Sequence, residues 1–76
     1  MTLQRALYLH IEDQAHLKPS TRAAYRYDAR AIITAHGGDT PIGQINWGHI
    51  IATLGDGANR GAWHLTFRFM DWLGYR

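Results

Sequence analysis

The chain contains no cysteine, only two prolines and no long apolar run. The absence of cysteine excludes disulfides, thiol catalysis and cysteine-ligated zinc, and it fits a reducing, cytoplasmic location. A membrane-spanning helix needs about 20 consecutive apolar residues. Polar residues such as Arg5, His10 and Glu12 interrupt the first apolar stretch, so neither a membrane partner nor a signal peptide is expected. No glycine-rich phosphate loop follows a strand pattern, which argues against nucleotide hydrolysis.

What the chain does contain suffices for one small domain, residues 1–76. Its 76 residues leave no room for a second core. Apolar residues make up 46% and aromatic residues 12% of the chain, which is enough for a compact core. The formal net charge is +2 and the pI about 9.4, a balance that permits an acidic partner without demanding one.

The spacing of apolar residues predicts four helices and no strand, hence an all-α four-helix bundle. The helices are expected at about residues 2–15, 19–36, 46–54 and 58–73. In the first, Leu3, Leu7 and Ile11 fall on one face. In the third, Ile50, Ile51 and Leu54 are expected to point inward. Between the second and third helices, Ile42 and Ile45 are expected to turn back into the core.

Capping residues mark the expected ends of these helices. Thr2 and Asn46 are typical N-caps, and the hydroxyls of Ser20 and Thr21 can satisfy free amides behind Pro19. Glycine is typical of helix ends and turns. The expected helix ends and turns contain Gly37-Gly38, Gly55-Asp56-Gly57 and Gly74.

The last helix carries two apolar stripes. The residues predicted to form its buried stripe are Ala62, Leu65, Phe69, Trp72 and Leu73. Trp63, Phe67 and Met70 form the second stripe, which is expected to pack against the first helix. The alternative is an exposed docking surface for another domain or protomer. Trp47, beside a helix cap, is expected to cover the core.

Two helices each carry a column of basic side chains. Arg22, Arg26 and Arg30 recur every fourth residue, and Lys18 precedes them. Asp28 is the only acid between Lys18 and Ile33. Guanidinium groups match phosphate oxygens and guanine edges, and a helix N-terminus binds phosphate readily. The second column consists of Arg60, His64 and Arg68, with Asn59 at its start.

These columns have two interpretations. In the first they bind double-stranded DNA, which requires both columns to converge on one face. In the second they are ordinary solvated faces of a helical protein–protein interaction module that does not bind DNA. A helix-turn-helix regulator is disfavoured, because the link between the second and third helices is too long and glycine-rich for a tight turn.

Five histidines raise the question of a metal site: His10, His16, His36, His49 and His64. None forms a His-Glu-x-x-His motif or an i, i+4 pair, so zinc is not expected, and no cofactor is implied. Of the four tyrosines, Tyr25 is interpreted as a packing residue and Tyr75 as exposed.

The stretch Lys-Pro-Ser-Thr-Arg-Ala-Ala-Tyr-Arg-Tyr-Asp from Lys18 to Asp28 resembles the second helix of the core-binding domain of tyrosine recombinases, the phage-integrase family. Thr21, Ala24, Tyr25 and Asp28 occupy that family's recurring positions. The resemblance continues in order through nearly the whole chain. Its further parts are Leu3, Leu7 and Ile11, then Pro41-Ile42 and Ile45, then Asn59-Arg60, Leu65, Phe69, Trp72 and Gly74.

This resemblance implies a SAM-like bundle that clamps duplex DNA for site-specific recombination. The family's catalytic domain, expected to follow this chain, cuts and rejoins strands, so the chain alone is not expected to be an enzyme. Possible partners besides DNA are that catalytic domain and neighbouring recombinase protomers. Together with Arg30 from the basic column, the expected DNA-binding residues are Lys18, Ser20, Thr21, Arg22, Arg26, Asn59, Arg60, His64 and Arg68.

Overall fold

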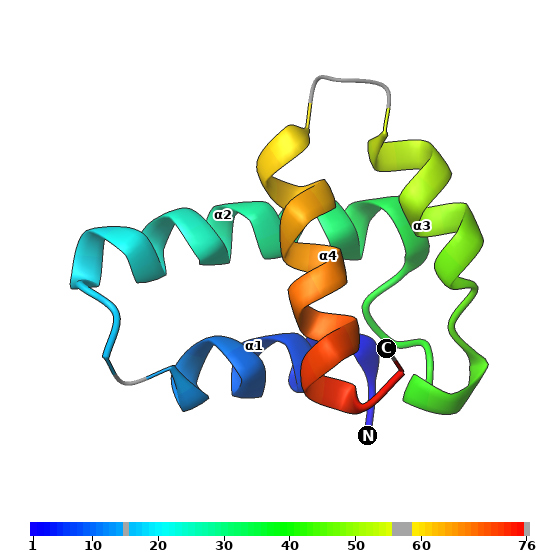
Figure 1. Cartoon of the computed structure of the whole chain (residues 1–76). Coiled ribbons are helices and arrows are strands. Elements are labelled where there is room, and N and C mark those ends of the chain that lie inside the picture. Colours follow the sequence, from blue (N-terminus) through cyan, green and yellow to red (C-terminus); the bar gives the residue numbers. More distant parts are fainter. Residues whose placement is uncertain (15, 56–58, 76) are drawn as a thin grey trace.

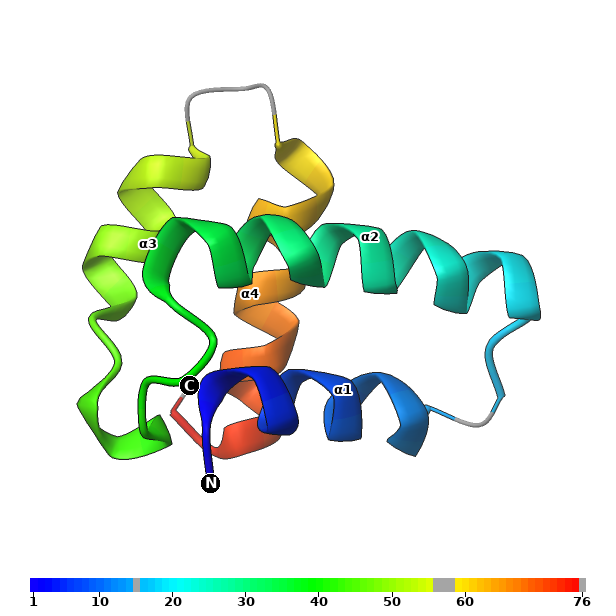
Figure 2. The ribbon, with the colours of Figure 1, turned by 180° about the vertical axis from the view of Figure 1, so that it is seen from behind.

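The computed structural model describes residues 1–14, 16–55 and 59–75. Within them the chain forms four α-helices and no strand, which confirms the predicted all-α class. The helices are α1 (Leu3–Asp13), α2 (Pro19–His36), α3 (Trp47–Leu54) and α4 (Arg60–Leu73), with one 3₁₀ turn, η1 (Ile42–Gln44). In Figure 1, α1 and α2 run beside each other, α4 crosses in front of both, and α3 lies at one end. Figure 2 shows α1 and α2 in front of α4 from the opposite side.

Local capping sets four of the eight helix ends, as predicted. The Thr2 hydroxyl accepts from the Arg5 amide at 3.3 Å, and the Asn46 side chain accepts from the His49 amide at 3.0 Å. Gly37 and Gly74 end α2 and α4 with φ of 108° and 89°, conformations that favour glycine. The expected ends at Ala15 and Ala58, and the turn at Asp56-Gly57, lie outside the described residues.

One predicted cap is wrong. α2 has Lys18 as its N-cap and no side-chain capping hydrogen bond. Pro19 occupies the first helical position, which places Ser20 and Thr21 inside the helix. An N-cap side chain must lie before the helix to reach the first amides, and lysine offers no acceptor. The first-turn amides of α2 are therefore left without a side-chain partner.

The loop between α2 and η1 completes the N-terminus of α1 by backbone pairing. The Leu3 amide donates to the Thr40 carbonyl at 2.8 Å, and the Gln4 amide donates to the Gly38 carbonyl at 3.0 Å. Amides of a first helical turn have no partner within the helix, so this loop replaces a capping motif. Beyond it, Ile42 and Ile45 pack against the core, as predicted.

The core forms where the four helices meet. Its fully or almost fully buried apolar residues are Leu3, Ala6, Leu7, Ile11, Ala29, Ile32, Ile50, Leu54, Ala62, Leu65 and Phe69. Thr66 is also buried, and its hydroxyl donates to the Ala62 carbonyl within α4. Trp72, predicted to be buried, is instead 41% exposed, and its indole donates to the Asp13 carboxylate at 3.0 Å. Leu73 is half-buried and packs against the core.

The aromatic residues around Phe69 join three helices. Its ring lies 5.7 Å, between centroids, from both His10 of α1 and Trp47 of α3. Trp47 is half-buried and lies edge-on to Phe69, so it covers this side of the core as predicted. In the described part of the chain, no helix combines the length and hydropathy needed to cross a membrane.

Candidate nucleic-acid interface

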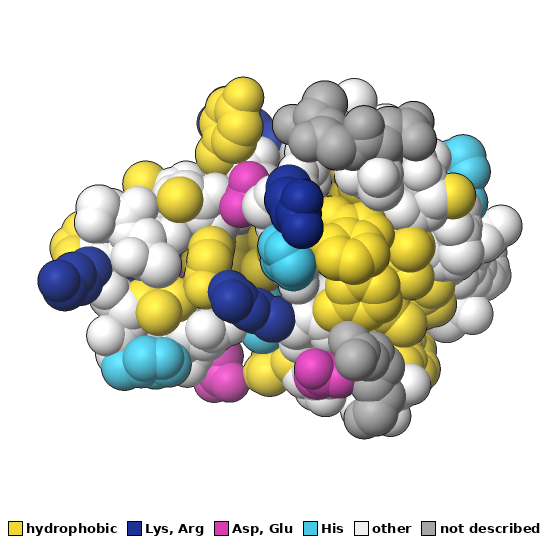
Figure 3. Space-filling model, turned by 45° about the horizontal axis from the view of Figure 1, so that its top comes forward, with side chains coloured by type: hydrophobic (Ala, Val, Ile, Leu, Met, Phe, Trp, Pro, Cys, Tyr) yellow, Lys and Arg dark blue, Asp and Glu magenta, His cyan; other side chains and the backbone are white. Residues whose placement is uncertain are grey.

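The clearest row of basic side chains lies along α4. Arg60, His64 and Arg68 are exposed and follow one another at four-residue spacing. The buried face of the helix carries Leu65 and Phe69, so the row points away from the core. Figure 3 shows lysine or arginine and histidine side chains gathered along α4. Asn59, the N-cap of α4, is exposed and makes no side-chain capping bond.

Arg68 is held in this row by α2. Its Nη1 donates to the Tyr25 hydroxyl, and its guanidinium carbon lies 5.7 Å from the centroid of the Tyr25 ring. Tyr25 is half-buried and packs against the core, which confirms its prediction as a packing residue. A guanidinium with both a hydroxyl partner and an aromatic neighbour loses less freedom on binding a ligand than a solvated one.

Acidic residues border the row on both helices: Asp28 lies on α2, and Asp71 follows Arg68 by three residues on the exposed side of α4. The Asp28 carboxylate oxygens lie 2.8 and 2.9 Å from the position that a Cβ of Gly61 would occupy, so the glycine is what lets α4 approach α2 here. Burial raises the pKa of Asp28. Figure 3 shows an acidic side chain beside the basic row. A carboxylate at this point weakens the attraction of the row for an anionic partner.

Arg22 has a structural role. It is half-buried, and its Nη2 donates to the Gln14 carbonyl at 3.2 Å across the α1–α2 turn. Its Nε is buried without a hydrogen-bond partner. This guanidinium closes a turn between helices, so it is less available to an outside ligand than the sequence suggests.

Arg26 and Arg30 lie on another side of α2. Each is two residues from Asp28, which corresponds to about 160° around a helix. Since Asp28 faces α4, both arginines point away from the α4 row. They line a hollow together with Ala23 and Tyr27. The expectation that the two basic columns converge on one face is therefore not met for their cations, although Arg30 lines one hollow with Asn59 at the start of α4.

The N-terminus of α2 does share a face with the α4 row. Thr21, Tyr25 and Asp28 recur at helical spacing, and the last two contact α4. That stripe leads from the start of α2 to the row over about 10 Å of helix. Lys18 and Ser20 are exposed at its start, and the first-turn amides there lack a side-chain cap.

A buried histidine lies behind Arg68. His10 is only 3% exposed and packs against Phe69 and Trp72. The Gln14 side-chain amide donates to its Nε2 at 3.1 Å, which leaves the proton on Nδ1, where no partner is found. Burial lowers the pKa of His10; Asp13 opposes this shift and Arg68 adds to it.

This histidine is expected to make folding sensitive to acid. The folded chain binds fewer protons at His10 than the unfolded chain, so stability rises with pH. The free energy of unfolding is expected to fall as the pH drops below 6.5, the ordinary pKa of histidine, toward the lowered pKa of His10. Urea unfolding at several pH values should show a smaller loss at acid pH for His10→Leu than for the wild-type chain. Equal losses in both proteins would contradict this role.

Two other histidines connect α2 to α3. His36 Nε2 accepts from the Asn46 amide at 2.9 Å, and His49 Nε2 donates to the Ala35 carbonyl at 3.2 Å. Their rings lie 6.2 Å apart. Across the described residues, no group of three or more His, Cys, Asp or Glu side chains is placed to hold a metal ion. These histidines are explained by their hydrogen bonds.

An apolar surface lies next to the basic row, between α3 and α4 (Figure 3). Trp63, Phe67 and Met70 are half-buried, and the Trp63 and Phe67 ring centroids lie 4.8 Å apart. Trp63 lines a hollow with Leu54 and Gly55 at the end of α3. The prediction that this stripe packs against the first helix is wrong for Trp63, because α4 turns that side toward α3.

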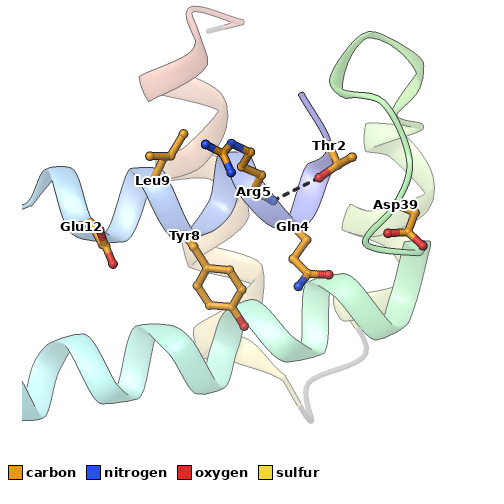
Figure 4. Close-up of a pocket in the computed structure, with 7 residues that line it drawn as sticks. All are labelled: Thr2, Gln4, Arg5, Tyr8, Leu9, Glu12 and Asp39. Atoms are coloured by element: carbon orange, nitrogen blue, oxygen red, sulfur yellow. Dashed lines mark hydrogen bonds between the residues drawn. The ribbon is translucent and has the colours of Figure 1, made fainter.

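A separate hollow follows the exposed side of α1 (Figure 4). Its lining residues are Thr2, Gln4, Arg5, Tyr8, Leu9, Glu12 and Asp39. Figure 4 shows Tyr8 directed toward α2 and Leu9 directed away from it. The hollow combines one cation with two acids, a mixture without a preference for an anionic ligand.

Comparison with known proteins adds no family assignment: no family model, curated protein or solved structure matches the chain.

Proposed function

We propose that this chain binds double-stranded DNA in the manner of the SAM-like core-binding domain of tyrosine recombinases. The observation that carries the proposal is the exposed row of Arg60, His64 and Arg68, joined on one face to the uncapped N-terminus of α2. The catalytic steps of recombination belong to a separate domain in that family, and we assign none of them to this chain.

The row has dimensions that suit a duplex. Arg60 and Arg68 are eight residues apart, which is about 12 Å along a helix. The major groove is about 12 Å wide and admits an α-helix. In this proposal α4 faces the groove, and its arginines contact phosphates or guanine edges. Lys18 and the first amides of α2 bind a neighbouring phosphate, as helix N-termini commonly do.

In this proposal, three of the ten expected DNA-binding residues do not contact the duplex. Arg22 supports the α1–α2 turn, and Arg26 and Arg30 lie on the other side of α2. Three full cations therefore remain for the duplex: Lys18, Arg60 and Arg68. The logarithm of the binding constant should then fall against the logarithm of salt concentration with a slope of about −3.

Salt titration tests this directly. Binding of a fluorescein-labelled duplex, followed by anisotropy, should weaken with that slope as salt increases. Asp28→Asn should bind more tightly than wild type, because it removes one of the acids beside the row. Asp39→Asn makes the same charge change in an exposed loop and serves as the control. No binding at low salt, or equal effects of the two variants, would contradict the proposal.

A protein–protein interaction module is the second candidate. The half-buried apolar surface of Trp63, Phe67 and Met70 favours it, as does the separation of Arg26 and Arg30 from the α4 row. Apolar surface next to charged residues is typical of docking faces. A chain of this kind would show no salt-dependent affinity for DNA.

A further inference from the structure

Tyr27 projects from the side of α2 that α4 does not cover. Tyr27 is 75% exposed, more than any other large hydrophobic residue in the described part of the chain. The buried residues of α2 are Ala29 and Ile32, so core packing does not explain an aromatic residue at this position. Figure 2 shows α2 along the edge of the bundle, in front of α4.

The surroundings of Tyr27 form a small site. Ala23, Arg26, Tyr27 and Arg30 line one hollow. The last three follow Ala23 by three, four and seven residues, a spacing that places all four on one side of the helix. Ala23, one turn before Tyr27, is too small to cover its ring. The exposed ring thus remains accessible to a ligand, and both guanidinium groups belong to the same hollow.

The charge around this hollow has a single sign. Arg26 and Arg30 are exposed, and Asp28 lies about 160° away around the helix. The adjoining hollow shares Tyr27 and Arg30 and adds polar residues, among them Thr34, Thr53 and Asn59. Neither hollow has an acidic residue among its lining residues. The surface therefore combines an open aromatic ring, two cations and neutral hydrogen-bonding groups.

We propose that this face of α2 binds single-stranded DNA, with an unpaired base stacked on Tyr27 and the flanking phosphates held by Arg26 and Arg30. Exposed aromatic rings beside cations are how proteins bind single strands without sequence preference. A duplex offers no such base, because its bases are already stacked on one another. The site adjoins the start of α4 at Asn59 but contains none of the cations of the α4 row, so it does not require duplex binding there.

Anisotropy with a fluorescein-labelled oligothymidylate of about 10 nucleotides tests the proposal. Tyr27→Ala should weaken binding about 10-fold, since stacking of one base accounts for roughly that factor. Tyr27→Phe keeps the ring and should bind like wild type. Tyr75→Ala, which removes another exposed tyrosine, is the control. Circular dichroism checks that each variant is folded; little effect on folding is expected because Tyr27 is exposed.

Two further measurements separate this site from the duplex site. Arg26→Ala/Arg30→Ala should weaken binding of the oligothymidylate and flatten its salt dependence while leaving duplex affinity unchanged. Saturating unlabelled duplex should not displace the oligothymidylate. Wild-type affinity in Tyr27→Ala, equal losses in Tyr27→Phe and Tyr27→Ala, or full displacement by duplex would each overturn the proposal. None of these outcomes decides whether the α4 row binds a duplex.

Discussion

Phe69→Ala is expected to remove a large part of the chain's free energy of unfolding. Phe69 is fully buried, and its ring joins α1, α3 and α4 through His10 and Trp47. Removing a buried phenylalanine side chain costs about 3–5 kcal/mol. A chain of this length has a total stability of roughly 4–11 kcal/mol. Urea unfolding followed by circular dichroism should show this loss directly.

A conservative substitution at the same position provides the control. Phe69→Leu retains most of the buried volume and should cost less than about 1.5 kcal/mol. The rings of His10 and Trp47 then keep an apolar neighbour. A loss below 1 kcal/mol in Phe69→Ala would mean that the four helices do not depend on this contact, contrary to the packing described above.

Arg60→Ala/Arg68→Ala is expected to reduce duplex affinity by about 100-fold at low salt. A hydrogen bond to a charged group contributes about 1.5 kcal/mol or more, and about 1.4 kcal/mol is a factor of ten in affinity. Losing both contacts should also make the salt slope shallower by about 2. Anisotropy with a labelled duplex at several salt concentrations measures both quantities.

Arg26→Ala/Arg30→Ala is the matched control, because it removes the same charge from the opposite side of α2. It should leave duplex affinity nearly unchanged and weaken only the single-stranded probe. Equal loss of duplex affinity in the two double variants would show that net charge, and not the α4 row, attracts the duplex. Circular dichroism must show that Arg60→Ala/Arg68→Ala is folded, because Arg68 also donates a hydrogen bond to Tyr25.

The helices themselves could be predicted from the sequence because their signals are local. Thr2 and Asn46 cap α1 and α3 with their own side chains, and Gly37 and Gly74 supply the positive φ at two helix ends. Each of these effects involves residues a few positions apart. Ser20 and Thr21 are the exception. The helix begins at Pro19, so both residues lie inside it and neither caps it.

The prediction of burial succeeded at some positions and failed at others. Leu65 and Phe69 are buried as their spacing predicts, whereas Trp72 is 41% exposed at the edge of the same stripe. A periodic pattern gives the direction of a side chain but not how far the neighbouring helix extends. Trp72 lies where α4 passes Asp13 at the end of α1, so part of its ring remains in solvent.

The candidate site depended most on contacts between distant residues. Arg68 and Tyr25 are 43 positions apart, and no local pattern signals their hydrogen bond. The same holds for Asp28 beside Gly61 and for Arg22 at the Gln14 carbonyl. Arg22, Arg26 and Arg30 share a four-residue spacing in the sequence, but four-residue steps drift by about 40° around a helix.

The sequence by itself determined the all-α class, several helix ends and the presence of two basic columns, because helical periodicity and capping act over a few residues. Only the tertiary structure decided which side of α2 faces α4. That crossing directs Asp28 and Tyr25 toward the α4 row and leaves Arg26, Tyr27 and Arg30 on the outside. The separation into two surfaces follows from helix packing, since a rigid helix that turns one side to its neighbour must turn the other to solvent.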